Sequence, residues 1–209
     1  MKTLALESTY VMGGFLAVNN RDTAQIRRIG NIFVHENFVP NLYEQDIAML
    51  WVNEPFTYSS LVLPVCLPPP STLADLVEYK NSSATLTGWG RKWDNGPLSD
   101  QLLKVDLPVI SNDECMRWYD NSGSKQLIPE STFLCAGYEN GTMDACSGDS
   151  GGPLVQFRED QRAEVIGVVS WGIGCGVKGR PGVYTRVSKF VKWIHQTIEE
   201  NKDDYPRRK

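Results

Sequence analysis

The sequence is poor in histidine, has no excess of positive charge and contains no long apolar run. Its 21 Lys and Arg are outnumbered by 25 Asp and Glu, and the formal net charge of −4 argues against a surface that binds nucleic acid. No stretch approaches the roughly 20 apolar residues that a membrane-spanning helix needs. Glu7 interrupts the N-terminal residues where a secretory signal requires an apolar core. We therefore expect no nucleic-acid partner, no membrane span and no signal peptide within these residues.

The five cysteines do not form the CxxC spacing that is typical of zinc sites, so we expect no metal and no cofactor. Two Asn-x-Ser/Thr sequons make Asn81 and Asn140 candidate glycosylation sites. Cysteines combined with sequons favour an extracellular, secreted protein. Because the number of cysteines is odd, one of them is expected to find its partner outside the chain.

Short β-branched segments separated by Gly, Pro, Asn and Asp dominate the sequence. Leu103, Val105, Leu107 and Val109 alternate with polar or small neighbours, which is the period of a half-buried strand. Many short strands between turns indicate an all-β fold, either an antiparallel barrel or a sandwich. The expected strands are 28–34, 47–52, 84–88, 102–110, 153–157, 164–171 and 182–187.

One amphipathic helix is expected at the C-terminal end. Ser188 is its candidate N-cap, and Phe190, Val191, Ile194 and Ile198 fall on one helical face. We expect this face to pack on the strands.

The segment 148–153, GDSGGP, carries the clearest indication of chemistry. Glycines on both sides of Ser150 let a substrate carbonyl approach the backbone, and two nearby N–H groups can bind a developing oxyanion. A serine hydroxyl is a weak nucleophile until a base takes its proton. A Gly-rich surface turn is the alternative, and six specified positions in a row disfavour it.

Further specified motifs surround this segment. They are DIAML at 46–50, GWG at 88–90, FLCAG at 133–137, SWG at 170–172, GC at 174–175 and PGVYTRV at 181–187. Together with segment 144–153 they resemble the trypsin/chymotrypsin-like serine proteases, in the family's order and over roughly residues 10–198. The resemblance implies a double antiparallel β-barrel with a C-terminal helix and an active site between the barrels.

The same resemblance suggests how the chain is divided. Residues 1–63 are expected to form the remainder of an N-terminal barrel, 64–83 a proline-rich connector, and 84–200 the C-terminal barrel with its helix. Residues 201–209 are expected to be a disordered tail. The N-terminal barrel is expected to be incomplete, because the family's first strands have no counterpart in the sequence, and all these parts belong to one peptidase domain.

The resemblance implies roles for three residues of the reaction itself. Ser150 resembles the nucleophile of the family's Ser-His-Asp triad, and the N–H groups of Gly148 and Ser150 resemble its oxyanion donors. Asp46 resembles the carboxylate that orients the base. Taken alone, Asp46 is as readily interpreted as a residue at the end of a strand.

Other positions resemble the family's substrate-binding residues. Asp144, six residues before Ser150, resembles the acidic residue of a trypsin-type specificity pocket, which would bind the charged end of Arg or Lys. An ordinary turn aspartate is the alternative. Gly172 and Gly182 match small wall positions, and Ser170, Trp171 and Gly172 match the edge segment that pairs with the substrate backbone. Trp171 is equally compatible with a core aromatic.

By the family's pattern, Cys115 pairs with Cys135 and Cys146 pairs with Cys175. Cys66 resembles the cysteine that joins the catalytic domain to an upstream propeptide or chain, with a buried free thiol as the alternative. A further family disulfide is absent, because Ala84 and Gln156 stand at its two positions.

The triad histidine has no counterpart in the sequence. Only two histidines occur, and neither His35 nor His195 stands in the family's motif for the base. The activation-cleaved N-terminus, whose ammonium pairs in the family with the aspartate matching Asp149, has no counterpart either. We expect Asp149 to be a costly buried charge or to point elsewhere. The chain is therefore predicted to be N-terminally truncated and inactive.

Three interpretations stay open. The first is a portion of a trypsin-like endopeptidase that cleaves after Arg or Lys through an acyl-enzyme, with basic peptides and protease inhibitors as partners. The second is a non-catalytic homologue that acts as a binding or regulatory module. The third is a pseudogene-like or alternatively spliced product with no stable fold.

Overall fold

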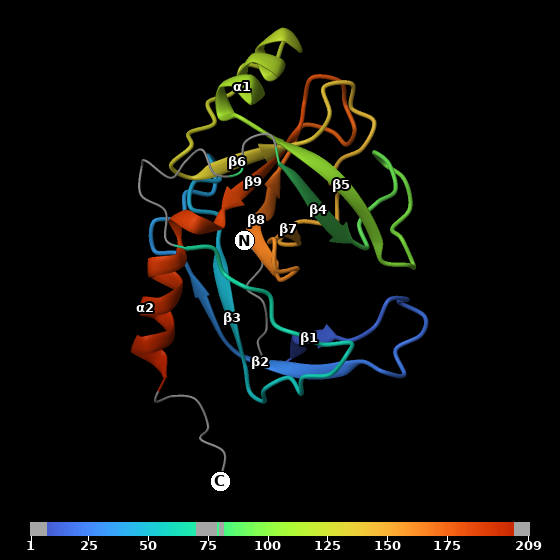
Figure 1. The fold of residues 1–209 in the computed structure, drawn as a ribbon, viewed down its shortest axis with the longest axis vertical. Helices are drawn as coiled ribbons and strands as arrows, with labels where there is room; N and C mark the ends of the chain where they lie inside the picture. The colour runs from blue at the N-terminus through green and yellow to red at the C-terminus, as the bar shows by residue number, and fades with distance from the viewer. Residues whose placement is uncertain (1–7, 70–78, 80–81, 203–209) are drawn as a thin grey trace.

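The computed structural model describes residues 8–69, 79 and 82–202, and it contains one closed barrel and one open sheet (Figure 1). Six antiparallel strands close the barrel in the order β4-β5-β6-β9-β8-β7. Their bounds are Ser83–Gly88 for β4, Leu103–Ile110 for β5, Phe133–Ala136 for β6, Pro153–Phe157 for β7, Ala163–Trp171 for β8 and Gly182–Arg186 for β9. The sequence therefore predicts the all-β, trypsin-like architecture correctly.

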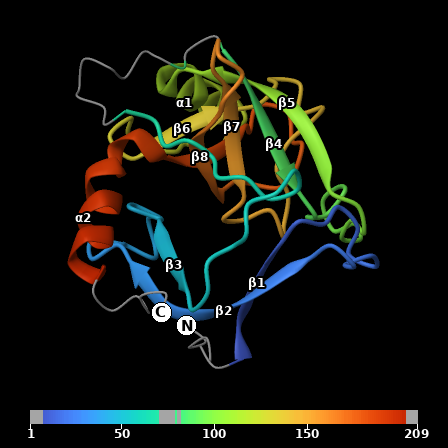
Figure 2. The same cartoon turned by 60° about the horizontal axis from the view of Figure 1, so that its bottom comes forward.

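The N-terminal part is a three-stranded antiparallel sheet in the order β1-β2-β3. β1 spans Tyr10–Gly13, β2 Gln25–Val34 and β3 Ala48–Val52. Val34 pairs with Ala48, and Ile32 pairs with Leu50. Val34 and Leu50 are 53% and 51% exposed. In Figure 2 this sheet lies apart from the barrel and does not curl into a closed structure. The expected incomplete barrel is thus an open sheet that leaves apolar side chains in solvent.

The apolar core lies inside the closed barrel. Alternate residues of its strands point inward, and Leu107, Leu134, Leu154, Ile166 and Tyr184 are fully buried. A second cluster, around Cys115, Tyr119 and Phe133, lies where a helix covers the end of the barrel. β6 is buried at all four positions, so it shows no alternation, and strand periodicity did not predict it.

That helix, α1 (Asn112–Asn121), was not predicted, although its start has a sequence signature. Ser111 is the N-cap, and its side chain accepts a hydrogen bond from the N–H of Glu114 at 3.2 Å. Ser-x-x-Glu is the capping-box pattern, which favours a helix start. The buried side chains of Cys115 and Tyr119 are four residues apart, so they share one helical face.

The C-terminal helix α2 (Val191–Asn201) forms, but its predicted details need two corrections. Ser188 is not the N-cap, because it lies buried in the 3₁₀ turn Val187–Lys189, and Phe190 occupies the N-cap position. Ile198 is 40% exposed, and Thr197 is buried instead. The apolar face therefore ends one turn earlier than the sequence pattern indicated.

α2 also contacts the open sheet. The ring of His35, just after β2, packs edge-on against Phe190 at 5.4 Å and against Trp193 at 5.0 Å. Trp193 Nε1 donates a hydrogen bond to Glu36 at 3.0 Å. None of the described helices is long and apolar enough to cross a membrane.

Candidate functional site

Ser150 lies in a tight loop that immediately precedes β7. Gly148 has φ of +103°, a conformation that favours glycine. A Cβ at Gly148 would lie 2.9 Å from Leu98 Cδ2 and 3.1 Å from the Cα of Gly90, so packing excludes a side chain as well.

Backbone hydrogen bonds hold the loop around Ser150. The N–H groups of Asp149, Gly151 and Gly152 donate to Cys146, Val169 and Asp149 at 2.8–2.9 Å. Among the described residues, no acceptor faces the N–H groups of Gly148 and Ser150. The loop thus leaves two free donors beside one serine hydroxyl, which is the arrangement an oxyanion site needs.

Asp149 is held by backbone amides. Its Oδ1 accepts from Gly90 N at 2.8 Å and its Oδ2 accepts from Cys146 N at 3.0 Å. A Cβ at Gly88 or Gly90 would collide with this carboxylate, which explains the glycines of the GWG motif. Asp149 also borders a cavity of about 430 Å³, here called the first cavity. The expected unpaired charge is therefore partly compensated, because two N–H groups bind the carboxylate.

A second cavity, of about 410 Å³, gathers the predicted binding residues from distant parts of the chain. We call it the specificity cavity. Ser150 comes from the loop before β7, Asp144 from the preceding turn and Gly182 from the start of β9. Its lining includes Ser150, Asp144, Ser170, Trp171, Gly172 and Gly182.

Asp144 lies at the cavity with its carboxylate bound to backbone. Oδ1 accepts from Ala145 N at 2.8 Å and Oδ2 accepts from Gly176 N at 3.1 Å. Burial raises the pKa of Asp144 to about 6, although these two amide hydrogen bonds lower it. A carboxylate that loses hydration in this way gains strongly when a cation binds it.

The two glycines in the cavity wall, Gly172 and Gly182, lack a side chain for different reasons. A Cβ at Gly182 would lie 3.0 Å from Asp144 Oδ1 and 2.9 Å from the Tyr184 hydroxyl, so the protein's own packing requires glycine. A Cβ at Gly172 would meet only the carbonyl of Gly174, at an ordinary 3.7 Å. The missing side chain at Gly172 therefore matters only to a molecule inside the cavity.

Asp46 makes two hydrogen bonds to the barrel, and one of them joins its carboxylate to a residue that lines the cavity. Its Oδ2 accepts from Ser170 Oγ at 2.7 Å, and its backbone carbonyl accepts from Thr185 Oγ1 at 2.7 Å. Ser170 lines the specificity cavity, so Asp46 lies just behind the wall. This carboxylate comes from the loop between β2 and β3 of the open sheet, whereas both hydroxyls come from strands of the barrel.

Comparison with known proteins agrees with this geometry. The sequence model of the Trypsin family matches residues 5–194. The chain belongs to the trypsin family. It is 42% identical to serine proteinase stubble of Drosophila melanogaster over 82% of this chain and 21% of that protein. It is 36% identical to serine protease filzig of the same fly over 91% of this chain and 11% of that protein. It is 38% identical to transmembrane protease serine 11G of Rattus norvegicus over 80% of this chain and 38% of that protein. The chain thus spans well under half the length of these relatives.

Neither histidine of this trypsin-family chain lies at the specificity cavity. His35 is packed between the sheet and α2, and its Nδ1 accepts from Asn37 N at 3.2 Å. His195, on α2, borders a separate cavity of about 940 Å³. Ser150 and Asp46 are therefore present without an imidazole between them in the described residues.

Sequence reasoning missed several residues that line the specificity cavity or lie behind its wall. Tyr184 lines the cavity and Thr185 holds the Asp46 carbonyl, and both stand in the PGVYTRV motif, which signalled their importance without giving their roles. Tyr43 and Asp94 also line the cavity. They lie in surface loops, so nothing in the local sequence indicated them. Trp171, which was predicted, lines the cavity and also packs against Tyr119 and Phe133.

The structure forms both disulfides that the family pattern implies, Cys115–Cys135 and Cys146–Cys175. Cys66 is a free, half-buried thiol. Its backbone is held by β8, with Cys66 N donating to Ala163 O at 2.9 Å and Val165 N donating to Cys66 O at 3.0 Å. Four of the five cysteines are therefore paired in disulfides, and Cys66 is the one that is free.

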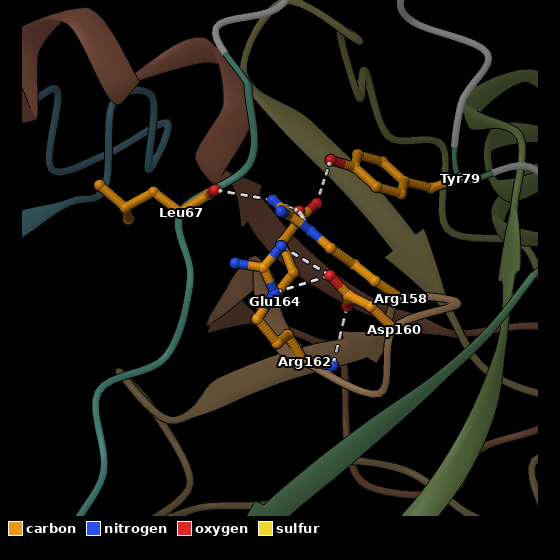
Figure 3. A network of polar contacts seen from close by, with 6 residues as sticks. All are labelled: Leu67, Tyr79, Arg158, Asp160, Arg162 and Glu164. Carbon is orange, nitrogen blue, oxygen red and sulfur yellow. Dashed lines mark hydrogen bonds and ion pairs between the residues drawn. The ribbon is translucent and has the colours of Figure 1, made fainter.

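A polar network lies beside Cys66 and fixes the connector to the barrel (Figure 3). Arg158, in the turn after β7, binds the buried carboxylate of Glu164 and donates to Leu67 O at 3.2 Å. The hydroxyl of Tyr79 donates to Glu164 at 3.1 Å. Because Glu164 is buried and fully paired, this network is structural and offers no free charge to a ligand.

Of the candidate glycosylation sites, Asn140 is exposed, and its Oδ1 accepts hydrogen bonds from Thr142 N and Oγ1 at 3.3 and 3.0 Å. Asn81 lies outside the described residues.

Proposed function

We propose that this domain belongs to an endopeptidase that cleaves after Arg or Lys, and that these 209 residues alone bind such peptides without hydrolysing them. The observation that carries the proposal is the specificity cavity, which Ser150 and the desolvated carboxylate of Asp144 both line, together with the two free N–H groups of the Ser150 loop. A guanidinium or ammonium on Asp144 would place the adjoining peptide carbonyl beside Ser150.

In the proposed reaction the Ser150 oxygen attacks the carbonyl carbon after the basic residue. The hydroxyl proton passes to an imidazole, the oxyanion accepts hydrogen bonds from Gly148 and Ser150, and the amine leaves with that proton. Water then attacks the acyl-enzyme and releases the acid. Asp46, oriented by Ser170, would hold the imidazole, and no histidine of these residues is placed to receive the proton.

The absence of an imidazole at the cavity favours a second candidate, a non-catalytic module that docks basic peptides on Asp144. The two candidates share the binding step and differ in whether Ser150 ever reacts. An arginyl peptide would remain intact when bound to such a module.

We also propose an extracellular setting in which Cys66 joins an upstream chain by a disulfide and Asn140 carries a glycan. The half-buried Cys66 thiol and the exposed sequon at Asn140 support these assignments. Protease inhibitors that present Arg or Lys are further proposed partners of the cavity.

The test combines binding with labelling of the purified chain. Benzamidine, a single amidinium, should bind the wild type, and Asp144→Asn should weaken its binding at least about tenfold. A fluorophosphonate should leave Ser150 essentially unlabelled, as in the Ser150→Ala control. Stoichiometric labelling at Ser150 would contradict the proposal that the chain does not hydrolyse peptides. Benzamidine affinity that is unchanged in Asp144→Asn would contradict the proposed specificity.

A further inference from the structure

The specificity cavity carries a second acidic group that the proposed function does not use. The charged residues among its described lining are both aspartates, Asp144 and Asp94. Asp94 belongs to the loop between β4 and β5, and no basic residue lines the cavity to neutralise it. The negative potential of the cavity therefore extends beyond Asp144.

A short hairpin fixes the position of Asp94. Arg91 pairs with Leu98, Lys92 N donates to Pro97 O at 3.2 Å, and Gly96 N closes the turn on Trp93 O at 2.8 Å. A Cβ at Gly96 would lie 2.7 Å from the Trp93 ring, so this turn requires glycine. The backbone of Asp94 therefore lies at the apex of a well-defined turn.

Asp94 faces the cavity wall near Gly174. A Cβ built on Gly174 would lie 3.8 Å from Asp94 Oδ2. Among the described residues, Asp94 makes no hydrogen bond and no ion pair. Its carboxylate is therefore open to solvent and to whatever enters the cavity.

The inner end of the cavity contains an independent sign of a ligand. Tyr184 is fully buried, and its hydroxyl finds no hydrogen-bond partner in the described part of the chain. A buried hydroxyl without a partner is costly, so this group and Asp144 are suited to a polar cationic guest. Burial, followed by the charge of Asp144, raises the pKa of Tyr184, so its hydroxyl stays neutral and its oxygen can accept a hydrogen bond from a cation.

The chain itself gives the spacing of the two carboxylates. Gly176 holds Asp144 and Gly174 lies beside Asp94, and these glycines are two residues apart. Two residues span at most about 7 Å of chain, and the carboxylates lie 3.1 Å and 3.8 Å beyond its two ends. The two anionic groups are therefore no more than about 14 Å apart, which one short ligand can span.

We infer that the specificity cavity binds ligands with two cationic groups, one on Asp144 and a second, within about 14 Å of it, on Asp94. This inference rests on the proposed function, because it takes Asp144 as the first cation site. The preferred peptides would carry a second basic group close to the Arg or Lys before the cleaved bond. Asp94 thus sets specificity and takes no part in the reaction.

The experiment compares benzamidine with amidines that carry an added ammonium on linkers of increasing length, by calorimetry in low salt. The best linker should bind the wild type about threefold to fivefold tighter than benzamidine, as expected for a partly exposed ion pair. Asp94→Asn should abolish this gain and leave benzamidine binding within about twofold, whereas Asp94→Glu should keep most of it. Asp100→Asn, an exposed aspartate nearby in sequence, should behave as the wild type.

The possible outcomes distinguish a failure of this inference from a failure of the proposed function. A gain that survives Asp94→Asn, or no gain at any linker length while benzamidine binds through Asp144, overturns this inference alone. Benzamidine binding that is absent, or unchanged in Asp144→Asn, overturns the proposed specificity and this inference with it. The gain should also shrink in concentrated salt, because an exposed ion pair is screened.

Discussion

The closed barrel and the open N-terminal sheet differ in how they bury apolar side chains. Leu134, Leu154 and Tyr184 in the barrel are fully buried, whereas Ile29, at 4% exposure, is the single buried residue between residues 8 and 65. The barrel also contains the Ser150 loop, both disulfides and most of the specificity cavity. The N-terminal part contributes Asp46 and Tyr43, from the loop between β2 and β3.

This difference teaches that the residues proposed for binding and those proposed for proton transfer lie in separately stabilised parts. The barrel has the packing that a stable folding unit needs, and it carries the parts that would bind a basic side chain. The sheet is held through a few contacts, such as Asp46 with Ser170 and Thr185 and His35 with α2. Loosening the sheet should therefore affect Asp46 before it affects Asp144.

The largest expected effect comes from matched leucine truncations in the two regions. Leu154→Ala should lower the free energy of unfolding by about 2–5 kcal/mol, because it leaves a cavity in a fully packed core. Leu50→Ala, at a side chain that is 51% exposed, should cost less than about 1 kcal/mol. Urea unfolding monitored by circular dichroism measures both. Equal losses would contradict the contrast between barrel and sheet.

An intermediate effect is expected of pH on benzamidine affinity. It depends on Asp144, which lies in the barrel part of the chain. Because burial raises the pKa of Asp144 to about 6, the carboxyl is largely protonated below that pH and cannot attract a cation. Benzamidine affinity should rise with pH through this range and level off above it, with binding at pH 5 about tenfold weaker than at the plateau. Calorimetry across pH 5–8 checks this. Leu50→Ala should keep the same profile, and a flat profile in the wild type would contradict the assignment.

The smallest expected effect concerns the contact between the two regions. Thr185→Val removes the hydroxyl that donates to the Asp46 carbonyl and should cost about 1 kcal/mol. Amide hydrogen exchange should become faster in β3, with little change in the barrel strands. Thr85→Val, which removes a hydrogen bond to Asp106 within the barrel, is the control and should leave β3 exchange unchanged. Faster exchange throughout the barrel would show that the regions are not separable.

The sequence predicts the parts of the site that lie within continuous motifs. Ser150, Gly148 and Asp144 occur in one run of residues, so their proximity follows from the chain itself. Alternation along β5 likewise predicts a strand, because one face is buried and the other is not. The disulfide pairing and the role of Gly182 came from the family resemblance, since spacing alone leaves several pairings open.

What escaped prediction depends on contacts between distant segments or on uniform burial. The hydrogen bond from Ser170 to Asp46 joins residues that are 124 positions apart, and no local pattern reports such a contact. Asp94 reaches the cavity only through the shape of its hairpin. β6 lacks alternation because every residue is buried. α1 had a readable capping box at Ser111, and the prevalence of strand signals around it hid that signature.

The separation of 124 positions between Asp46 and Ser170 has a consequence for biosynthesis. Chains emerge from the ribosome at about 5–20 residues per second, so the serine is made roughly 6 to 25 seconds after the aspartate it orients. During that interval the nascent sheet lacks β8 and β9, whose residues Ser170 and Thr185 bind Asp46. Chaperones therefore have a defined window in which to protect an exposed apolar surface, and the newborn protein acquires an oriented Asp46 only after Ser170 has been made.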